Sequence, residues 1–229
     1  MEDLKLIYRG KTKDVYEKSD GSYVLKIKDD ATGKDGKFDP GENAVGLSIE
    51  GLGKASLRMS KYFFELINKQ GIPTHYLDCD LDEVTMNVLA VTMFGQGLEF
   101  VCRRKAVGSF IRRYGQYAKE GQELDYLVEV TLKDDEKGDP LITKDALVML
   151  EVISEEDYEI CKDLTQRITK IIYEDLVTKG LELYDIKYEF GKHQGKTILI
   201  DEVSASSMRV YKDNEVVEPL ELTRLILEA

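Results

Sequence analysis

The sequence predicts an α+β protein with two lobes, residues 1–94 and 95–229. Short strand-like runs separated by Gly or Asp dominate the first third of the chain. The clearest helical pattern instead lies in the last third, beginning at Ser154. Between these regions, Gly95-Gln96-Gly97 is the best candidate for a hinge.

The first lobe is predicted to begin with three antiparallel strands, at residues 4–8, 15–18 and 22–28. Residues 29–53 are rich in glycine and are predicted to be a loop, and loops this long are usually functional or disordered. A helix is expected from Lys54 to Gln70, because its apolar residues fall on one face and Gly71 ends the pattern. Strands are expected at 72–77 and 84–92.

The second lobe is predicted to contain strands at 98–104 and 125–132, with a short helix at 110–114. Ser154 followed by Glu155, Glu156 and Asp157 is typical of a capping box, and it opens a long helix that ends near Gly180. A hairpin is expected from residues 181–190 and 197–203, turning at 191–195. Pro219 suits the first turn of a last helix that runs to Leu227.

Composition excludes several classes of protein. The chain has 229 residues with 32 Lys and Arg against 44 Asp and Glu, a net charge of −12, which argues against non-specific binding to nucleic acid. No window is apolar enough for a membrane span, and the N-terminus is too charged for a signal peptide. Three scattered cysteines, at 79, 102 and 161, predict a reducing, cytoplasmic location rather than a disulfide framework.

Two basic segments are candidates for anion binding. Gly10, Lys11 and Lys13 lie at a turn between two strands, where backbone N–H and ammonium groups can face a polyphosphate, and Lys26 on the next strand is expected to reach the same anion. Residues 99–115 hold five basic side chains and one acid, and Arg103 and Ser109 stand out as anion ligands. The alternatives are an exposed charged hairpin and a basic face that pairs with surplus acids.

The strongest cluster lies on the predicted hairpin. Asp185, Lys187 and Glu189 alternate, so they project from one face of a strand, and Asp201 ends the partner strand. Because Mg²⁺ takes one or two carboxylates together with phosphate oxygens, Glu189 and Asp201 suit a magnesium site. An internal salt-bridge ladder is the alternative. Lys133 follows a strand directly, while Ser204, Ser206 and Ser207 before Arg209 read by themselves as turn residues.

Together these motifs make the chain resemble the SAICAR synthetase family of purine biosynthesis. The similar segments follow the family's order from residue 10 to residue 209, and it is this order and spacing that makes them specific. They are residues 10–16, 28–32, 71–75, 99–115, 133–135, 139–140, 185–191 and 201–202, with Arg209.

The resemblance implies a first lobe like the nucleotide-binding lobes of kinases and ATP-grasp enzymes, and a larger α+β second lobe. It also implies a reaction in which ATP, a carboxyaminoimidazole ribonucleotide and L-aspartate give the succinocarboxamide, ADP and phosphate. A carboxylate is a poor electrophile, so transfer of the γ-phosphoryl group would first make an acyl phosphate that an amine can attack. A homodimer is suggested by the family likeness alone.

The same resemblance implies roles for individual residues. ATP would be contacted by Gly10, Lys11, Lys13, Lys26 and Lys187. The ribonucleotide would be bound by Arg103, Ser109 and Arg209. Mg²⁺ would be held by Glu189 and Asp201, and Lys133, Asp185 and Lys187 would be catalytic members of the site.

Some positions depart from the family's usual pattern and indicate a divergent branch. Ser206 stands where the family usually has an aspartate, so an expected carboxylate is missing near Arg209. Arg104 stands for the usual Asn, Gly97 for a common proline and Tyr211 for the usual Trp, and residues 33–53 differ from the usual loop. Two other functions therefore stay open: a small-molecule kinase with the same ATP lobe, and a nucleotide-binding module without chemistry.

Overall fold

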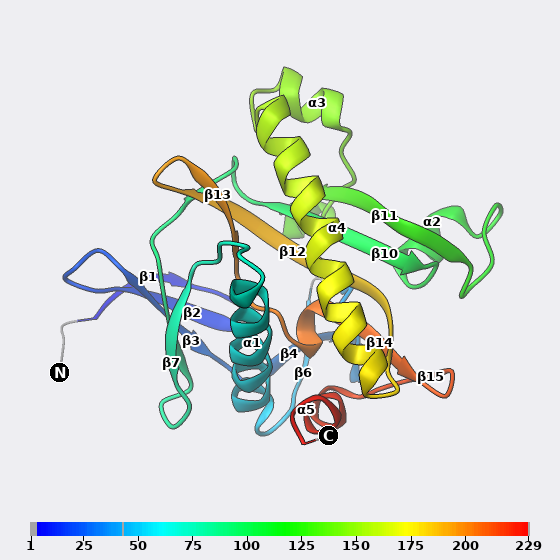
Figure 1. Ribbon diagram of the computed structural model, residues 1–229, viewed down its shortest axis with the longest axis horizontal. Helices are drawn as coiled ribbons and strands as arrows, with labels where there is room; N and C mark the ends of the chain where they lie inside the picture. The colour runs from blue at the N-terminus through cyan, green and yellow to red at the C-terminus, as the bar shows by residue number, and fades with distance from the viewer. Residues whose placement is uncertain (1–3, 43, 229) are drawn as a thin grey trace.

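The first sheet is antiparallel and lies at the N-terminal side of the molecule (Figure 1). We describe residues 4–42 and 44–228 of a computed structural model of the chain. The strand order is β1-β2-β3-β8-β7. The bounds are Lys5–Arg9 for β1, Lys13–Glu17 for β2, Tyr23–Ile27 for β3, Tyr76–Asp80 for β7 and Thr85–Val88 for β8. The three strands predicted at the start of the chain are therefore present, to within two residues at most ends.

The second sheet is larger and carries the strands of the predicted hairpin. Its main path is β11-β10-β12-β14-β15, and β13 and β9 also pair with β12. The bounds are Thr92–Met93 for β9, Leu98–Lys105 for β10, Glu123–Leu132 for β11, Glu182–His193 for β12, Lys196–Ile200 for β13, Met208–Lys212 for β14 and Glu215–Val216 for β15. The strand pairs of this sheet are antiparallel.

The prediction of a loop over residues 29–53 is wrong. This segment forms a third sheet, β5-β4-β6, from Asp30–Lys34, Lys37–Phe38 and Val45–Ser48. Its glycines allow strands to approach closely: a Cβ on Gly46 would lie 2.5 Å from the backbone of Gly33. Because glycines contribute no side chains, the apolar and polar alternation that identifies a strand is absent from the sequence.

Other boundaries differ for similar reasons. Strand β12 continues through Gly191 to His193, whereas a turn was predicted to begin at Gly191. A Cβ at Gly191 would lie 3.1 Å from the carbonyl oxygen of Thr92, so this glycine admits the neighbouring strand β9 and does not mark a turn. Strand β7 begins only at Tyr76. Strands β14 and β15 and the short helix α3, Lys144–Met149, were not predicted.

The main helices follow the sequence signals closely. Helix α4, Glu155–Thr178, begins where Ser154 Oγ accepts a hydrogen bond from the backbone of Asp157, as the capping pattern predicts. Helix α1, Leu52–Lys69, starts two residues before the expected position. Helix α5, Pro219–Leu227, has its proline in the first turn, and α2 spans Ser109–Tyr114. Two further single-turn 3₁₀ segments occupy Asp135–Lys137 and Ala205–Ser207.

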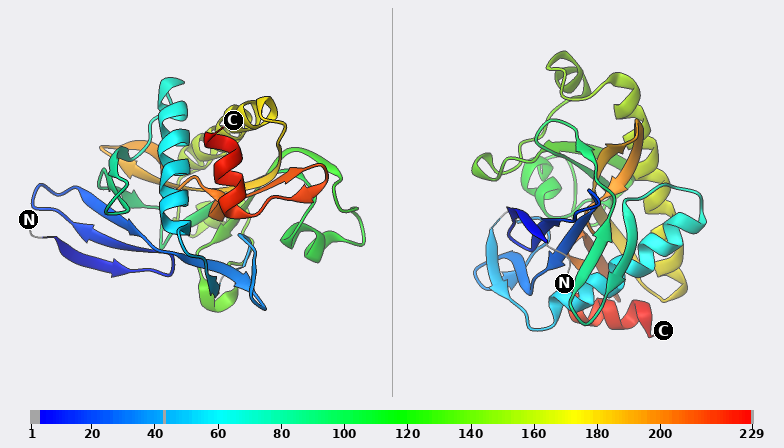
Figure 2. Two further views of the ribbon diagram at one scale, coloured as in Figure 1. Left: turned by 90° about the horizontal axis from the view of Figure 1, so that it is seen from below. Right: turned by 90° about the vertical axis from the view of Figure 1, so that its left-hand side faces the viewer.

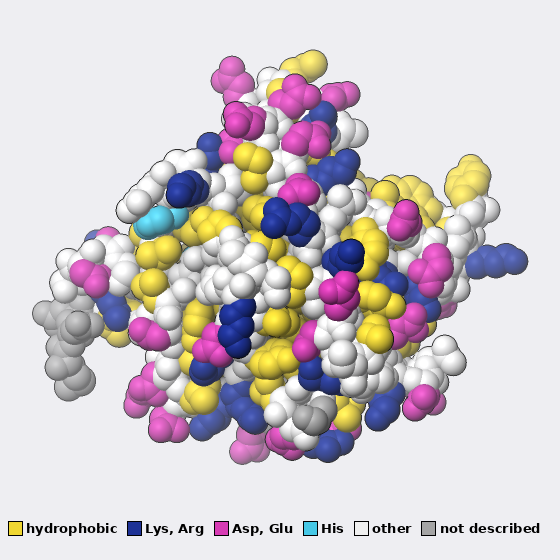
Figure 3. Space-filling model, in the orientation of Figure 1, with side chains coloured by type: hydrophobic (Ala, Val, Ile, Leu, Met, Phe, Trp, Pro, Cys, Tyr) yellow, Lys and Arg dark blue, Asp and Glu magenta, His cyan; other side chains and the backbone are white. Residues whose placement is uncertain are grey.

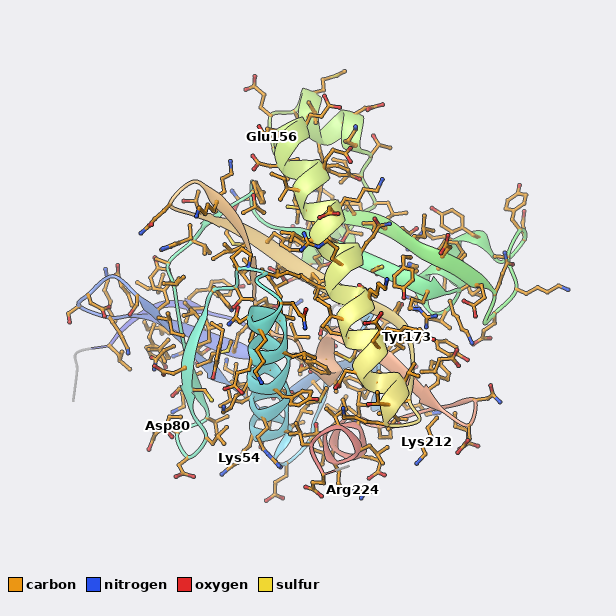
Figure 4. The ribbon with its side chains drawn as sticks, in the orientation of Figure 1. Lys54, Asp80, Glu156, Tyr173, Lys212 and Arg224 are labelled. Carbon is orange, nitrogen blue, oxygen red and sulfur yellow. The ribbon has the colours of Figure 1, made fainter. Side chains whose placement is uncertain are left out.

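Helix α4 crosses one face of the second sheet, and α1 lies beside α5 (Figures 1 and 2). Alternate residues of the central strands, such as Phe100, Tyr188 and Phe190, point toward α4 and are fully buried. Tyr173 from α4, labelled in Figure 4, packs on the guanidinium of Arg104, 3.4 Å from its ring centroid. With this face covered by α4, the opposite face of the sheet is left for a site.

The proposed division at residue 94 falls between elements that are joined by hydrogen bonds. Gly95 and Gly97 have positive φ values of 55° and 120°, which suit a sharp change of chain direction. Strand β9, just before them, already pairs with β12 of the second sheet.

The outer surface mixes charges of both signs. Figure 3 shows Lys and Arg side chains interspersed with Asp and Glu over one face of the molecule. Among the described residues, none of the helices combines the length and the apolar character that crossing a membrane requires.

Candidate functional site

An open pocket of about 1010 Å³ lies against the face of the second sheet that α4 does not cover. Residues of the first sheet and of the small third sheet complete its walls. The pocket brings together all but one of the predicted site residues: Gly10, Lys11, Lys13, Arg103, Ser109, Lys133, Asp185, Lys187, Glu189, Asp201 and Arg209.

Lys26 is the exception, and the position of its side chain does not support the predicted contact with ATP. Its side chain is exposed and does not line the pocket. In the β2–β3 pair, Lys13 lies opposite Ile27 while Lys26 lies opposite Asp14. Because neighbouring residues of a strand point to opposite faces, Lys26 projects away from the face that Lys13 shares with Leu25 and Ile27.

Register places the functional side chains in rows across three strands. Arg103 on β10 pairs with Asp185 on β12, which pairs in turn with Arg209 on β14. Glu99 pairs with Glu189 at the other end of the same face. The predicted alternation of Asp185, Lys187 and Glu189 thus builds the floor of the pocket, with an arginine end and a carboxylate end.

Two lysines from outside this sheet neutralise the carboxylate end. The ammonium of Lys13 pairs with Asp201, and its nitrogen lies 3.8 Å from an oxygen of Glu202. Lys133 Nζ lies 2.6 Å from Oε1 of Glu189. Burial alone would lower the pKa of each lysine, but these carboxylates outweigh it and raise both pKa values.

The two predicted metal carboxylates differ in protonation tendency. Burial would raise the pKa of Asp201, but Lys13 and Lys133 outweigh it and hold that pKa well below its usual range. The pKa of Glu189 is raised, chiefly by burial and then by the negative charge of Asp201. Asp201 has a φ of 70°, an uncommon value for a residue other than glycine, and its backbone oxygen lies 2.9 Å from Nε2 of His75.

Glu99 is a member of the site that the sequence argument missed. Its Oε1 accepts a hydrogen bond of 2.7 Å from Lys187 Nζ, and its Oε2 accepts one of 2.9 Å from the Thr131 hydroxyl. The carboxylates Glu99 and Glu189 repel each other across the strands, and Lys187 and Lys133 offset this repulsion. The alternation of Glu99, Val101 and Arg103 along the predicted strand was the signal that could have identified it.

The arginine end is organised around Asp185. Oδ2 of Asp185 accepts hydrogen bonds from Nη1 of Arg103, at 2.8 Å, and from Nη1 of Arg209, at 2.7 Å. Arg103 also donates to the hydroxyl of Ser109, at 2.9 Å, and to Glu129, at 2.5 Å. One buried carboxylate therefore aims two guanidinium groups into the same space, which is a suitable arrangement for binding an anion.

Lys11 lies at the rim of the pocket, where its ammonium nitrogen is 2.8 Å from a carboxylate oxygen of Asp135. The side of the pocket formed by the first sheet and the following segment is apolar. It includes Val15, Leu25, Val88 and Met93. An apolar wall beside a row of lysines is suited to a ligand with a flat base and a polyphosphate.

A magnesium ion fits the donor set at the carboxylate end. Glu189 and Asp201 supply hard oxygen ligands, and they already attract cationic groups in the form of Lys133 and Lys13. Mg²⁺ is commonly held by only one or two protein carboxylates, with substrate phosphates and water as its other ligands. Within residues 4–42 and 44–228, no group of three or more His, Cys, Asp or Glu side chains is arranged to hold a metal ion.

Comparison with known proteins gives one consistent result. The family model described as SAICAR synthetase matches residues 6–221. The chain is 56% identical over 227 residues to the phosphoribosylaminoimidazole-succinocarboxamide synthase of Clostridium tetani, covering 98% of this chain and 100% of that one. The corresponding enzyme of Finegoldia magna is 35% identical over 91% of this chain and 86% of its own.

Two solved structures extend the likeness to three dimensions. One is described as SAICAR synthetase (type 2) in complex with ADP; it superposes with a TM-score of 0.85 at 26% identity, over 99% of this chain and 98% of that chain. The other is SAICAR synthetase from Pyrococcus horikoshii, with a TM-score of 0.78 at 26% identity over the same shares. The two-lobed α+β architecture expected from the sequence is the architecture of these proteins.

Proposed function

The chain belongs to the SAICAR synthetase family, and from this premise we propose which end of its pocket binds each substrate of the family's reaction. The enzyme is an ATP-dependent carbon–nitrogen ligase of purine biosynthesis. It joins L-aspartate to the carboxylate of 5-amino-1-(5-phosphoribosyl)imidazole-4-carboxylate and releases SAICAR, ADP and phosphate. The observation that carries our proposal is that the lysine-rich carboxylate end and the arginine end share one sheet face in one pocket.

ATP lies across the carboxylate end in this proposal. Its base would occupy the apolar wall near Val15 and Leu25, and its phosphates would face Gly10, Lys11, Lys13 and Lys187. The lysines would exchange their present carboxylate partners for phosphate oxygens, with little change of position. Mg²⁺ would be held by Glu189 and Asp201, where it would neutralise phosphate charge and orient the γ-phosphoryl group.

The ribonucleotide lies at the arginine end. Arg103, Ser109 and Arg209 supply donors for its phosphate or carboxylate, and Asp185 holds both guanidinium groups in place. This position brings the substrate carboxylate toward Lys187 and Lys133, beside the ATP phosphates. The residues mainly fix the distance and the alignment between the two reactants.

The chemistry then requires two transfers that balance. A carboxylate oxygen of the ribonucleotide attacks the γ-phosphorus of ATP, and the bond between that phosphorus and the bridging β-phosphate oxygen breaks. The products of this step are ADP and an acyl phosphate. The amine of L-aspartate attacks the acyl carbon, the carbon–oxygen bond to phosphate breaks, and the proton of the amine passes to the departing phosphate. Lys133 and Lys187 offset the negative charge that accumulates between the reactants.

ADP release tests this proposal directly. Purified protein is given Mg-ATP and the ribonucleotide with and without L-aspartate, and the nucleotide products are separated by chromatography. We expect ADP and the succinocarboxamide only when aspartate is present. Release without aspartate would favour a kinase or an uncoupled acyl phosphate, and binding of ATP without release would favour a silent module.

The proposal extends to the setting of the enzyme. We propose residues 1–94 and 95–229 as the two functional lobes, a cytoplasmic location and a homodimer, with no nucleic-acid partner. The three thiols at 79, 102 and 161 are free, which supports a reducing compartment, and the net charge of −12 disfavours nucleic acid. Light scattering on the purified protein measures its oligomeric state.

A further inference from the structure

The guanidinium of Arg209 is held from two directions. Nη1 donates to Asp185 on the neighbouring strand, and Nη2 donates to Oδ1 of Asp39 at 2.6 Å. Asp39 comes from the segment between β5 and β6, and 170 positions separate it from Arg209 in the chain. The small sheet, which was predicted to be a loop, therefore reaches the arginine end of the pocket.

Asp39 is itself fixed by its own segment. Its Oδ1 accepts a hydrogen bond of 2.9 Å from the backbone of Gly41, and its backbone carbonyl accepts one of 3.1 Å from the hydroxyl of Thr32. Partial burial would raise the pKa of Asp39, but Arg209 and the Gly41 N–H outweigh it and lower that pKa. The group is thus an ionised carboxylate in a defined position.

Two glycines leave the space that the guanidinium occupies. A Cβ on Gly41 would lie 2.2 Å from Nη2 of Arg209, and a Cβ on Gly108 would lie 2.7 Å from the same atom. The φ of Gly41 is outside the left-handed region, so an alanine there would be tolerated by the backbone and excluded only by Arg209. The side chain of Arg209 is only 12% exposed.

Asp39 does not line the pocket, whereas Gly41, Ser206 and Arg209 do. It therefore acts through Arg209.

We propose that Asp39 is a positioning residue for Arg209, held in place by its own segment beside the small sheet. Asp39, Gly41 and Gly108 form a cradle around Nη2 that directs the guanidinium toward the anionic ribonucleotide. This inference rests on the proposed role of Arg209 in binding that substrate. Without the cradle, Arg209 keeps its bond to Asp185 but loses its second fixed contact, so it samples other orientations.

The test compares the kinetics of Asp39→Asn and Gly41→Ala with those of the wild type. We expect each variant to raise KM for the ribonucleotide about 10-fold, the effect of losing one charge-assisted contact. The KM for ATP should change less than about 2-fold, because the carboxylate end is untouched. Asp213→Asn, in the exposed turn after β14, is the matched control and should behave as wild type.

If the wild-type protein shows no aspartate-dependent release of ADP, the proposed function itself is contradicted. If the wild type is active and the ribonucleotide KM is unchanged in Asp39→Asn or Gly41→Ala, the proposed positioning of Arg209 by the cradle is contradicted. A parallel rise in both KM values with a lower melting temperature would reduce Asp39 to a structural role. Gly41→Ala keeps every charge, so it tests the positioning of Arg209 even if Asp39→Asn does not fold.

Discussion

Nζ of Lys133 lies 2.6 Å from Oε1 of Glu189, and this pair joins the end of β11 to the middle of β12. Glu189 is buried beside Asp201, so its pKa is raised even though Lys133 and Lys187 act in the opposite direction. Removing the lysine charge should raise this pKa further, because the carboxylate loses its contact cation.

The first prediction follows from this pair. In Lys133→Gln, the fall of kcat/KM at low pH, the acid limb of the profile, should begin at a higher pH than in the wild type. The reason is that Glu189 must lose its proton before it can bind a cation. A pH series of initial rates at saturating Mg²⁺ measures the limb. An acid limb at the wild-type position would show that Glu189 ionisation does not control the rate.

The second prediction concerns the other proposed metal carboxylate. Asp201→Asn should lower turnover by about 100-fold or more, the usual scale for loss of one electrostatic contact at a reacting phosphate. Circular dichroism should remain that of the wild type, because asparagine keeps the shape and tolerates the positive φ of this position. Unchanged turnover in the folded variant would exclude Asp201 as a metal ligand.

The third prediction separates two lysines by the face on which they lie. Lys26→Ala should leave KM for ATP within about 2-fold of the wild type, because the side chain is exposed outside the pocket. Lys13→Ala should lower kcat/KM for ATP by about 100-fold. Steady-state kinetics on the two variants side by side provide the comparison, and equal losses would contradict the register of β2 and β3.

The fourth prediction uses the N-terminus of α4. Oδ1 of Asp157 accepts a hydrogen bond from Thr197, and Oδ2 pairs with Lys192 at 2.8 Å. Burial would raise the pKa of Asp157, but Lys192 and the hydroxyl donors lower it, so this carboxylate stabilises the fold above the unfolded pKa of about 3.9. That contribution is lost as pH falls through the lower folded pKa.

Asp157→Asn should therefore destabilise the protein by about 1–2 kcal/mol at pH 7 and by less as the pH falls below about 4. Urea unfolding of both proteins at several pH values gives the difference in free energy of unfolding. A difference that stays constant down to pH 3 would show that the charge of Asp157 contributes nothing.

The fifth prediction concerns the packed side of the second sheet. Phe190 is fully buried, and its ring centroid lies 5.5 Å from that of Phe100 in an edge-to-face contact. Phe190→Ala should cost about 3–5 kcal/mol of unfolding free energy, because the cavity under α4 cannot close completely. Tyr117→Ala, at a side chain that is 88% exposed, is the control and should change stability by about 0.5 kcal/mol or less.

Much of the fold could be predicted from local signals. The capping residue Ser154 marked helix α4, the first-turn proline Pro219 marked α5, and alternation marked β10, β11 and β12. The small sheet was missed because glycines carry no alternation, and β14 was missed because its few residues follow a serine-rich turn.

Part of the site could also be predicted from the sequence. Asp185, Lys187 and Glu189 share a face by their spacing alone, and the same rule applied to Lys13 and Lys26 would have excluded Lys26 once the β2–β3 register was known. Register is set by pairing between strands, so it could not be read from either strand separately.

Local signals were enough to predict the main helices, most strands of the two larger sheets, the reacting groups and their likeness to a known family, because caps, alternation and motif spacing are properties of neighbouring residues. Which charges meet depends on how the chain folds in three dimensions, and the pairs formed are Lys187 with Glu99 and Arg209 with Asp39. These contacts span 88 and 170 positions, and they form because strand pairing brings together partly buried charges, each of which requires a counter-charge.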